Sequence, residues 1–210
     1  MGGWRRRGLG AVVRRALDVT VAASLLAVTA PLLGLAALAV RLRLGAPVTF
    51  HQERAGRDGV PFDLVKLRTM RVADPSDDGP DSDRRRLNAL GRFLRATSID
   101  ELPSLVAVLR GEMSIVGPRP LPVRYLDRYT PRQARRHEVR PGLTGWAQVN
   151  GRNALGWDER LDLDVWYVEH QSVALDVRIM ARTAGVVLRG SGVSHDGHAT
   201  MPELPAAHPS

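Results

Sequence analysis

The chain has 210 residues, enough for one domain with a substantial core. It contains no cysteine, which excludes a disulfide framework, a thiolate zinc site and a cysteine nucleophile. The formal net charge of +8 indicates an anionic partner, which could be nucleic acid, an anionic lipid or a phosphorylated substrate.

The first predicted element is an uncharged apolar segment at residues 19–40. As a helix it would reach roughly 33 Å, enough to cross the core of a bilayer. Arginines flank both of its ends, whereas the positive-inside rule expects such charges on one side. Pro31 removes a backbone donor near the middle and kinks or breaks the helix, with Thr29 available to bond freed backbone groups. The pattern favours a re-entrant helix whose two ends share one face, with a simple membrane span as the alternative.

Residues 47–70 predict a β-hairpin, because two short strand-like runs flank the Gly-rich turn AGRDG. The second run, residues 62–70, carries Lys66 and Arg68, which alternate to the same side of a strand. Lys66 is the only lysine among 30 basic residues. It could mark a place where a compact ammonium suits better than a guanidinium. The alternative is an edge strand with solvated charges.

The rest of the chain is predicted to be mainly helical. Residues 73–86 are typical of a surface loop, and residues 87–111 predict two helical pieces that end at Gly111. Residues 121–139 suit a helix lying on an anionic membrane surface. Residues 158–170 and 174–189 predict two further helices. The expected fold class is therefore mostly α with a small β-hairpin element.

Two adjacent acids, Asp100 and Glu101, stand between arginines just before an apolar helical run. One interpretation is a capping box that begins at Ser98, although Pro103 would then fall where a backbone donor is normally used. The other is a reactive centre. One carboxylate would bind a divalent metal that neutralises phosphate oxygens, and the other would attack phosphorus.

Five stretches occur in an order that resembles the bacterial sugar transferase family, the small monotopic phosphoglycosyl transferases. They are RALDVTVA, FDLVKLRTM, LGRFLRATSIDELPSLVAVLRGEMSIVGPRP, RPGLTGWAQVNGRN and LDLDVWYVEHQSVALDVRIMART, within residues 12–189. The resemblance implies transfer of a sugar 1-phosphate from a UDP-sugar to a polyprenyl phosphate, typically undecaprenyl phosphate. It implies a covalent aspartyl phosphosugar intermediate, release of UMP, and a place as the first membrane step of exopolysaccharide or glycoconjugate synthesis.

The resemblance also implies roles for individual residues. Asp100 would be the nucleophile and Glu101 the ligand of a required Mg²⁺. The helix break lies at Pro31, where Ala30-Pro31 replaces the family's Ser-Pro pair. Asp176 matches a family acidic position near the site, and Asp164 lies in the same motif. The basic residues expected to bind the substrate phosphates are Lys66, Arg68, Arg95, Arg119 and Arg152.

The implied organisation has four parts: a basic N-terminal arm at residues 1–15, a broken re-entrant membrane helix at 16–44, a catalytic domain at 45–189 and a disordered tail at 190–210. The catalytic domain would lie against inner-leaflet lipids on the cytoplasmic face of the bacterial inner membrane, and nucleic acid is not an expected partner. Two alternatives stay open. One is a non-enzymatic, membrane-tethered basic module that binds nucleic acid or an acidic partner, and the other is a bitopic membrane protein with an unrelated domain.

Overall fold

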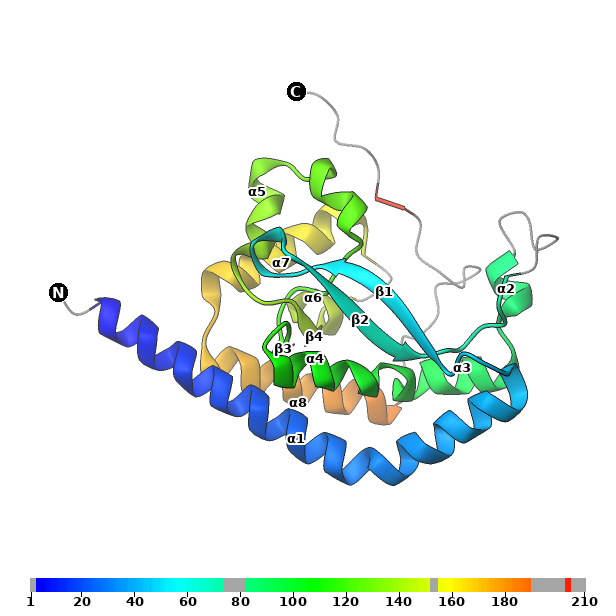
Figure 1. Ribbon diagram of the computed structural model, residues 1–210. Coiled ribbons are helices and arrows are strands. Elements are labelled where there is room, and N and C mark those ends of the chain that lie inside the picture. Colours follow the sequence, from blue (N-terminus) through cyan, green and yellow to red (C-terminus); the bar gives the residue numbers. More distant parts are fainter. Residues whose placement is uncertain (1–2, 74–81, 152–154, 190–202, 205–210) are drawn as a thin grey trace.

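The computed structural model describes residues 3–73, 82–151, 155–189 and 203–204. A long helix, α1 (Gly3–Leu44), is bent near its middle, and the rest of the chain lies on the concave side of the bend (Figure 1). Helices predominate, which confirms the mostly α fold, and the described residues form two small sheets. The elements after α1 are β1 (Thr49–Ala55), η1 (Arg57–Gly59), β2 (Pro61–Leu67), α2 (Ser82–Arg86), α3 (Ala89–Ala96), η2 (Ile99–Ser104), α4 (Leu105–Arg110), β3 (Ser114–Val116), η3 (Val123–Arg128), α5 (Pro131–Ala134), η4 (Arg135–Glu138), β4 (Gly142–Thr144), α6 (Trp146–Val149), α7 (Trp157–His170) and α8 (Val173–Arg189).

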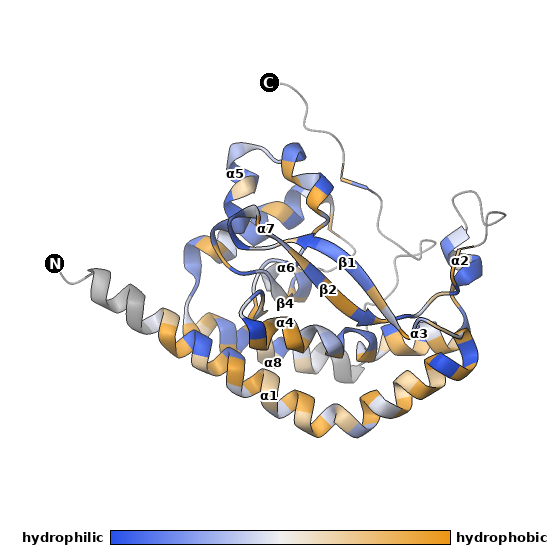
Figure 2. Cartoon of the chain, in the orientation of Figure 1, coloured by the Kyte–Doolittle hydropathy of each residue, from blue (hydrophilic) through white to orange (hydrophobic). Residues whose placement is uncertain are grey.

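Helix α1 continues through Pro31 as one helix, and it includes both the predicted basic arm and the predicted membrane segment. From Gly10 to Leu44 it is long and apolar enough to cross a membrane, as the hydropathy colours in Figure 2 show. Most of its central side chains are exposed, Val28 to 79%. The hydroxyl of Thr29 donates to the carbonyl of Leu25, so it does not replace the bond that Pro31 cannot make.

Helix α1 is joined to the rest of the fold on both sides of its bend. Before the bend, an oxygen of the Asp18 carboxylate accepts a hydrogen bond from the backbone of Ile115 at 2.8 Å. Arg15 donates to the carbonyls of Val108 and Leu109 at the end of α4, at 2.6 and 2.8 Å. Beyond the bend, Ala36 and Val40 pack in a small apolar cluster with Leu67, Leu94 and Ile99. Two separate attachments therefore fix both arms of α1 and leave most side chains of residues 23–35 exposed between them.

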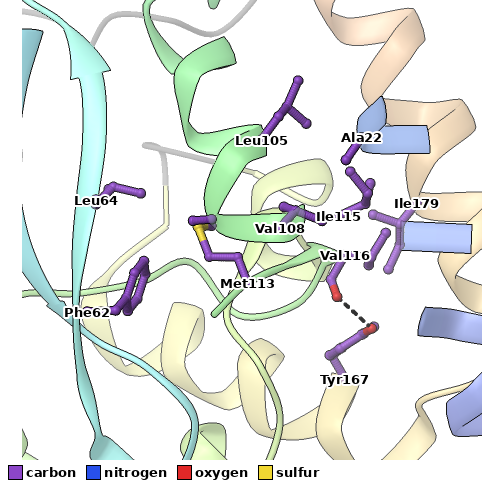
Figure 3. Packing of buried hydrophobic residues seen from close by; sticks show 11 residues of the cluster. Ala22, Phe62, Leu64, Leu105, Val108, Met113, Ile115, Val116, Tyr167 and Ile179 are labelled. Atoms are coloured by element: carbon purple, nitrogen blue, oxygen red, sulfur yellow. Dashed lines mark hydrogen bonds between the residues drawn. The ribbon is translucent and has the colours of Figure 1, made fainter. Parts of the chain in front are cut away.

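Strands β1 and β2 form the predicted antiparallel hairpin and pair along their whole length. The turn between them uses left-handed backbone at Asp58 and Gly59, with φ of 56° and 75°. Strand β2 ends at Leu67, three residues before the predicted end at Met70. The inner face of β2 contributes Phe62 and Leu64 to the main core, and Figure 3 shows α4 between this strand and Ile179 of α8. The buried residues of this core are Ala22, Phe62, Leu64, Leu105, Ala107, Val108, Met113, Ile115, Val116, Tyr167 and Ile179.

A second sheet, which the sequence patterns did not predict, pairs β3 with β4 in parallel. The two segments approach so closely that a Cβ atom at Gly142 would lie 2.0 Å from the backbone nitrogen of Gly117. Only glycine fits such a contact, because neither backbone can move without breaking the sheet. This pairing sets the position of the loop that follows β3.

Helices α7 and α8 confirm the two predicted C-terminal helices. The single helix predicted for residues 121–139 is wrong, because the segment forms three short pieces, η3, α5 and η4. Tyr129 and Thr130 have extended backbone, and Pro131, which follows them, cannot donate a helical hydrogen bond to the preceding turn. Tyr125 is buried in the domain, 5% exposed. In Figure 1, α5 lies at the end of the molecule away from the bend of α1, so this part of the segment does not lie beside the apolar helix.

Candidate active site

Asp100 and Glu101 lie in the first turn of η2, and α4 begins four residues after Glu101, at Leu105. Ser98 precedes η2 in a left-handed conformation, with φ of 57°, and its side chain makes no capping hydrogen bond. The capping box is therefore not formed, and the acids are not explained as a helix cap. A non-glycine residue in this conformation stores strain of the kind found at functional sites.

Glu101 is held by two cations from distant parts of the chain. Its Oε1 accepts hydrogen bonds from Nζ of Lys66, at the end of β2, and from Nη2 of Arg119, in the loop after β3, each at 2.6 Å. Burial alone would raise the pKa of Glu101, but Arg119 and Lys66 outweigh it and hold the pKa well below its usual range. Burial lowers the pKa of Lys66, and the negative charge of Glu101 opposes that change. Glu101 is therefore a stable carboxylate, charge-compensated by its two donors.

Asp100 is in a different state from its neighbour. Its residue is 7% exposed, and its carboxylate makes no hydrogen bond or ion pair with any residue that the structure describes. Burial, followed by the charge of Glu101, raises the pKa of Asp100 to about 6, while Lys66, Arg95 and Arg119 act in the opposite direction. A buried, unpaired carboxylate next to cations is suited to nucleophilic attack, because no hydrogen bond must be broken first.

A pocket opens beside Glu101, which we call the Glu101 pocket. Strands β1 and β2 supply Arg54, Leu64 and Lys66 from the same face of the hairpin. Burial, with the charges of Arg119 and Arg124, lowers the pKa of Arg54 to about 10. The pocket therefore combines concentrated positive charge with apolar walls, as a site for a phosphorylated ligand requires. Its lining residues are Arg54, Leu64, Lys66, Glu101, Ser104, Met113, Arg119, Pro120, Gly142 and Leu143.

Arg54 was not among the residues predicted from the sequence. Its guanidinium donates to the carbonyl of Pro120 at 3.1 Å and to the side-chain oxygen of Gln52, and its buried Nε has no partner in the part of the chain that the structure describes. The signal that could have revealed it is period-two alternation on β1, which places Arg54 on the same face as Lys66 once the hairpin register is known.

The other predicted basic residues differ in their positions. Arg95 donates to the hydroxyl of Thr69 at 3.0 Å and lies close enough to Asp100 to affect its pKa. Arg68 donates to the carbonyls of Leu44 and Gly45, at 2.6 and 2.7 Å, where it caps the end of α1. Arg152 lies outside the described residues. The phosphate-binding roles of these three arginines stay predictions.

Asp164 does not line the Glu101 pocket. It is connected to the backbone of Arg119 through Arg136. The Asp164 carboxylate accepts from Nη2 and Nε of Arg136, at 2.8 and 3.2 Å, and both side chains are almost fully buried. Nη2 of Arg136 also donates to the backbone carbonyl of Arg119 at 2.6 Å. Burial by itself would lower the pKa of Arg136, but Asp164 raises it, so the pair is ionised. This buried pair holds the backbone from which the Arg119 side chain reaches Glu101.

Asp176 lies in a separate network between α7 and α8. Its carboxylate accepts from the hydroxyl of Tyr167 at 2.7 Å, and that hydroxyl also donates to the carbonyl of Val116 at 3.2 Å. Burial raises the pKa of Asp176 to about 6. These contacts connect α8 to β3, and the predicted role of Asp176 near the reacting groups stays a prediction.

Glu101 can hold a magnesium ion, as predicted, only if the substrate supplies further ligands to the ion. Among the described residues no group of three or more His, Asp and Glu side chains converges on one point. Glu101 keeps one oxygen, Oε2, that forms no hydrogen bond with a described residue. Magnesium commonly binds one or two carboxylates together with substrate phosphates and water. Glu101 and its neighbour Asp100 therefore fit an ion that binds together with a diphosphate.

Comparisons with known proteins agree with the resemblance seen in the sequence motifs. The family model for bacterial sugar transferases matches residues 9–190. The uncharacterized sugar transferase EpsL of Bacillus subtilis is 47% identical over 189 residues, which is 90% of this chain and 94% of that protein. A UDP-glucose:undecaprenyl-phosphate glucose-1-phosphate transferase of Caulobacter vibrioides is 44% identical over 187 residues, 83% of this chain and 69% of that protein. An undecaprenyl-phosphate galactose phosphotransferase of Salmonella typhimurium is 35% identical over 197 residues, 86% of this chain and 41% of that protein. With a family match over most of its length, the chain belongs to the bacterial sugar transferases.

Proposed function

We propose that the protein transfers a sugar 1-phosphate from a UDP-sugar to undecaprenyl phosphate through a covalent intermediate on Asp100. The observation that carries this proposal is the state of the two acids: Glu101 is bound by Lys66 and Arg119, whereas Asp100 is buried and unbonded among the described residues. The names of two relatives state UDP-glucose and undecaprenyl phosphate as substrates in one case and undecaprenyl phosphate in the other. Membership of a transferase family argues against a non-enzymatic basic module.

In the first step, a carboxylate oxygen of Asp100 attacks the phosphorus that carries the sugar. The bond from that phosphorus to the bridging oxygen of the diphosphate breaks, and UMP leaves with the electron pair. In the second step, an oxygen of the lipid phosphate attacks the same phosphorus and displaces Asp100, which regenerates the carboxylate and gives a lipid diphosphate sugar. Lys66, Arg119 and Arg54 line the pocket beside Glu101, the residue after Asp100, and would stabilise the negative charge that develops on the phosphate oxygens.

Magnesium is expected to bind through Glu101 and the substrate diphosphate, and when bound it would neutralise phosphate oxygens. Glu101 also keeps Lys66 and Arg119 in place before substrate arrives, because all three side chains meet at one oxygen. The two cations can then turn to the phosphate oxygens with little movement, which reduces the reorganisation that the reaction requires.

The lipid substrate explains the bent apolar helix. We propose that α1 enters the cytoplasmic leaflet of the bacterial inner membrane, turns near Pro31 and leaves by the same face. The two attachments of α1 to the domain support this topology, because both arms rise from the bend toward the same folded part (Figure 1). Accessibility of N-terminal and C-terminal tags in intact cells tests it, and a terminus exposed outside would show a spanning helix instead.

The chemical proposal is tested by incubating the protein with magnesium, undecaprenyl phosphate and a panel of UDP-sugars that begins with UDP-glucose and UDP-galactose. UMP release measures turnover, and intact-protein mass spectrometry without the lipid detects a phosphosugar adduct. Asp100→Asn is expected to abolish both signals. Asp162→Asn is the matched control, because Asp162 is exposed and, among the residues that the structure describes, forms only a surface ion pair with Arg132. Full turnover by Asp100→Asn would refute the nucleophile assignment.

A further inference from the structure

A short segment near the end of the sequence is bound to the folded domain. Leu204 is 5% exposed and packs against the buried residues Leu121, Tyr125 and Leu161. Tyr129 and Trp157 complete the apolar surroundings. This surface, which we call the Leu204 site, is built from η3, the segment before it and α7. In Figure 1 the segment is the short red piece of the chain.

Charged contacts beside the apolar anchor orient the segment. The carboxylate of Glu203 is 2.8 Å from Nη2 of Arg124 and 3.6 Å from Nη1 of Arg128. Arg128 also donates to the carbonyl of Leu204 at 2.5 Å. The guanidiniums of Arg124 and Arg128 lie over the ring of Tyr125, at 5.3 and 5.1 Å from its centroid. The surface therefore recognises an acidic residue followed by a large apolar one.

The apolar contact is the stronger of the two. The side chains of Glu203 and Arg124 are 62% and 55% exposed, and exposed ion pairs contribute little because water screens them. Leu204, in contrast, loses nearly all of its contact with water. Replacing Leu204 should therefore release the segment, whereas the two arginines set its direction and register.

The Leu204 site includes part of the loop that carries Arg119. Leu121 is two residues after Arg119, and its carbonyl accepts from the backbone of Ala55 at 3.0 Å. The intervening Pro120 lines the Glu101 pocket, and its carbonyl accepts from Arg54. The stretch from 119 to 129 thus contacts the pocket at one end and the bound segment at the other.

We propose that the Leu204 site is a binding surface for an acidic–apolar peptide segment, that the chain's own Glu203–Leu204 is its occupant, and that occupancy stabilises residues 119–129. The surface has the features of a small peptide pocket, namely an aromatic wall, one deep apolar anchor and two arginines aimed at a carboxylate. Its binding energy comes from Leu204, so the contact is separable from the chemistry at Asp100.

The first test is amide hydrogen exchange on the full-length protein in lipid nanodiscs without UDP-sugar, so that its outcome does not depend on the proposed reaction. Leu204→Ala is expected to speed exchange within residues 121–129 by about tenfold or more, because local opening becomes easier when the anchor is lost. Glu138→Ala is the matched control, since Glu138 makes an exposed pair with Arg135 and does not touch the Leu204 site. Unchanged exchange in Leu204→Ala would overturn the proposal.

The second test adds the missing segment back in trans. A fluorescent peptide with the sequence ATMPELPA, residues 199–206, is titrated onto the full-length Leu204→Ala protein. The peptide is expected to bind and to restore slow exchange within residues 121–129, whereas a peptide with alanine in place of the leucine is expected to do neither. Equal binding of the two peptides, or no binding of either, would show that the surface does not recognise this segment.

Discussion

Replacing the proposed nucleophile with its neutral isostere should make the folded protein more stable while abolishing its activity. Asp100 is 7% exposed, and its pKa is raised from 3.8 to about 6, first by burial and then by the charge of Glu101. Since each pKa unit corresponds to about 1.36 kcal/mol, ionising Asp100 in the folded state costs about 3 kcal/mol more than in the unfolded chain. Asp100→Asn removes this cost and keeps nearly the same shape.

The effect must depend on pH in a defined direction. Below about pH 3 the carboxyl is protonated in both the folded and the unfolded state, so the wild type bears no such cost. As pH rises through about 6, the unfolded state is already ionised and the folded state must follow, so the wild type loses up to about 3 kcal/mol of stability. Asp100→Asn shows no such loss, and its advantage over the wild type should therefore appear between about pH 4 and 6 and stay constant above.

The assay is thermal and urea unfolding in nanodiscs, without divalent cations, across this pH range. For a domain of this size, about 3 kcal/mol corresponds to roughly 6–12 °C in Tm near pH 8. Asp164→Asn is the matched control: Asp164 is also buried but is bonded to Arg136, so the same substitution should cost about 3–5 kcal/mol by leaving a buried cation unpaired. An Asp100→Asn protein that is no more stable than the wild type at pH 8, or whose advantage is the same at pH 4, would refute the argument.

Three other predictions concern the site. Lys66→Arg should lower kcat/KM for UMP release by about tenfold or more, because a guanidinium is bulkier than the ammonium that shares Oε1 of Glu101 with Arg119; an unchanged rate would show that any cation suffices there. Turnover should fall as pH drops below about 6, because the carboxylate that attacks phosphorus becomes protonated; a pH–rate profile that is flat from 5 to 8 would contradict the pKa assigned to Asp100. Gly142→Ala should disrupt the β3–β4 pairing and lower both Tm and turnover, since its Cβ would lie 2.0 Å from the backbone of Gly117, whereas Gly34→Ala, with open space around it, should have little effect on Tm.

Local patterns were sufficient for the elements that depend on neighbours in sequence. The turn residues between β1 and β2 and the apolar spacing of α3 and α4 each specify structure within a few residues, and these predictions were confirmed. The uncharged run forms the apolar part of α1, which is bent but continuous through Pro31, and its re-entrant course in a membrane stays a proposal. The segment at 121–139 was misread because its arginines and tyrosines suggested a membrane surface. Its prolines and the burial of Tyr125 decided otherwise.

The sequence by itself therefore determined the family, the bent apolar helix, the hairpin and the Asp-Glu pair, because each depends on residues that are close together in the sequence. Only the tertiary structure decided which of the many arginines lie at the candidate site. Lys66 and Arg119 reach Glu101 from 35 and 18 residues away, Arg54 joins them through the hairpin register, and Arg68 turns to the end of α1. The difference between Asp100 and Glu101 has the same origin. Cations from distant parts of the chain bind Glu101 and lower its pKa. Asp100 has no such bond among the described residues, and burial raises its pKa.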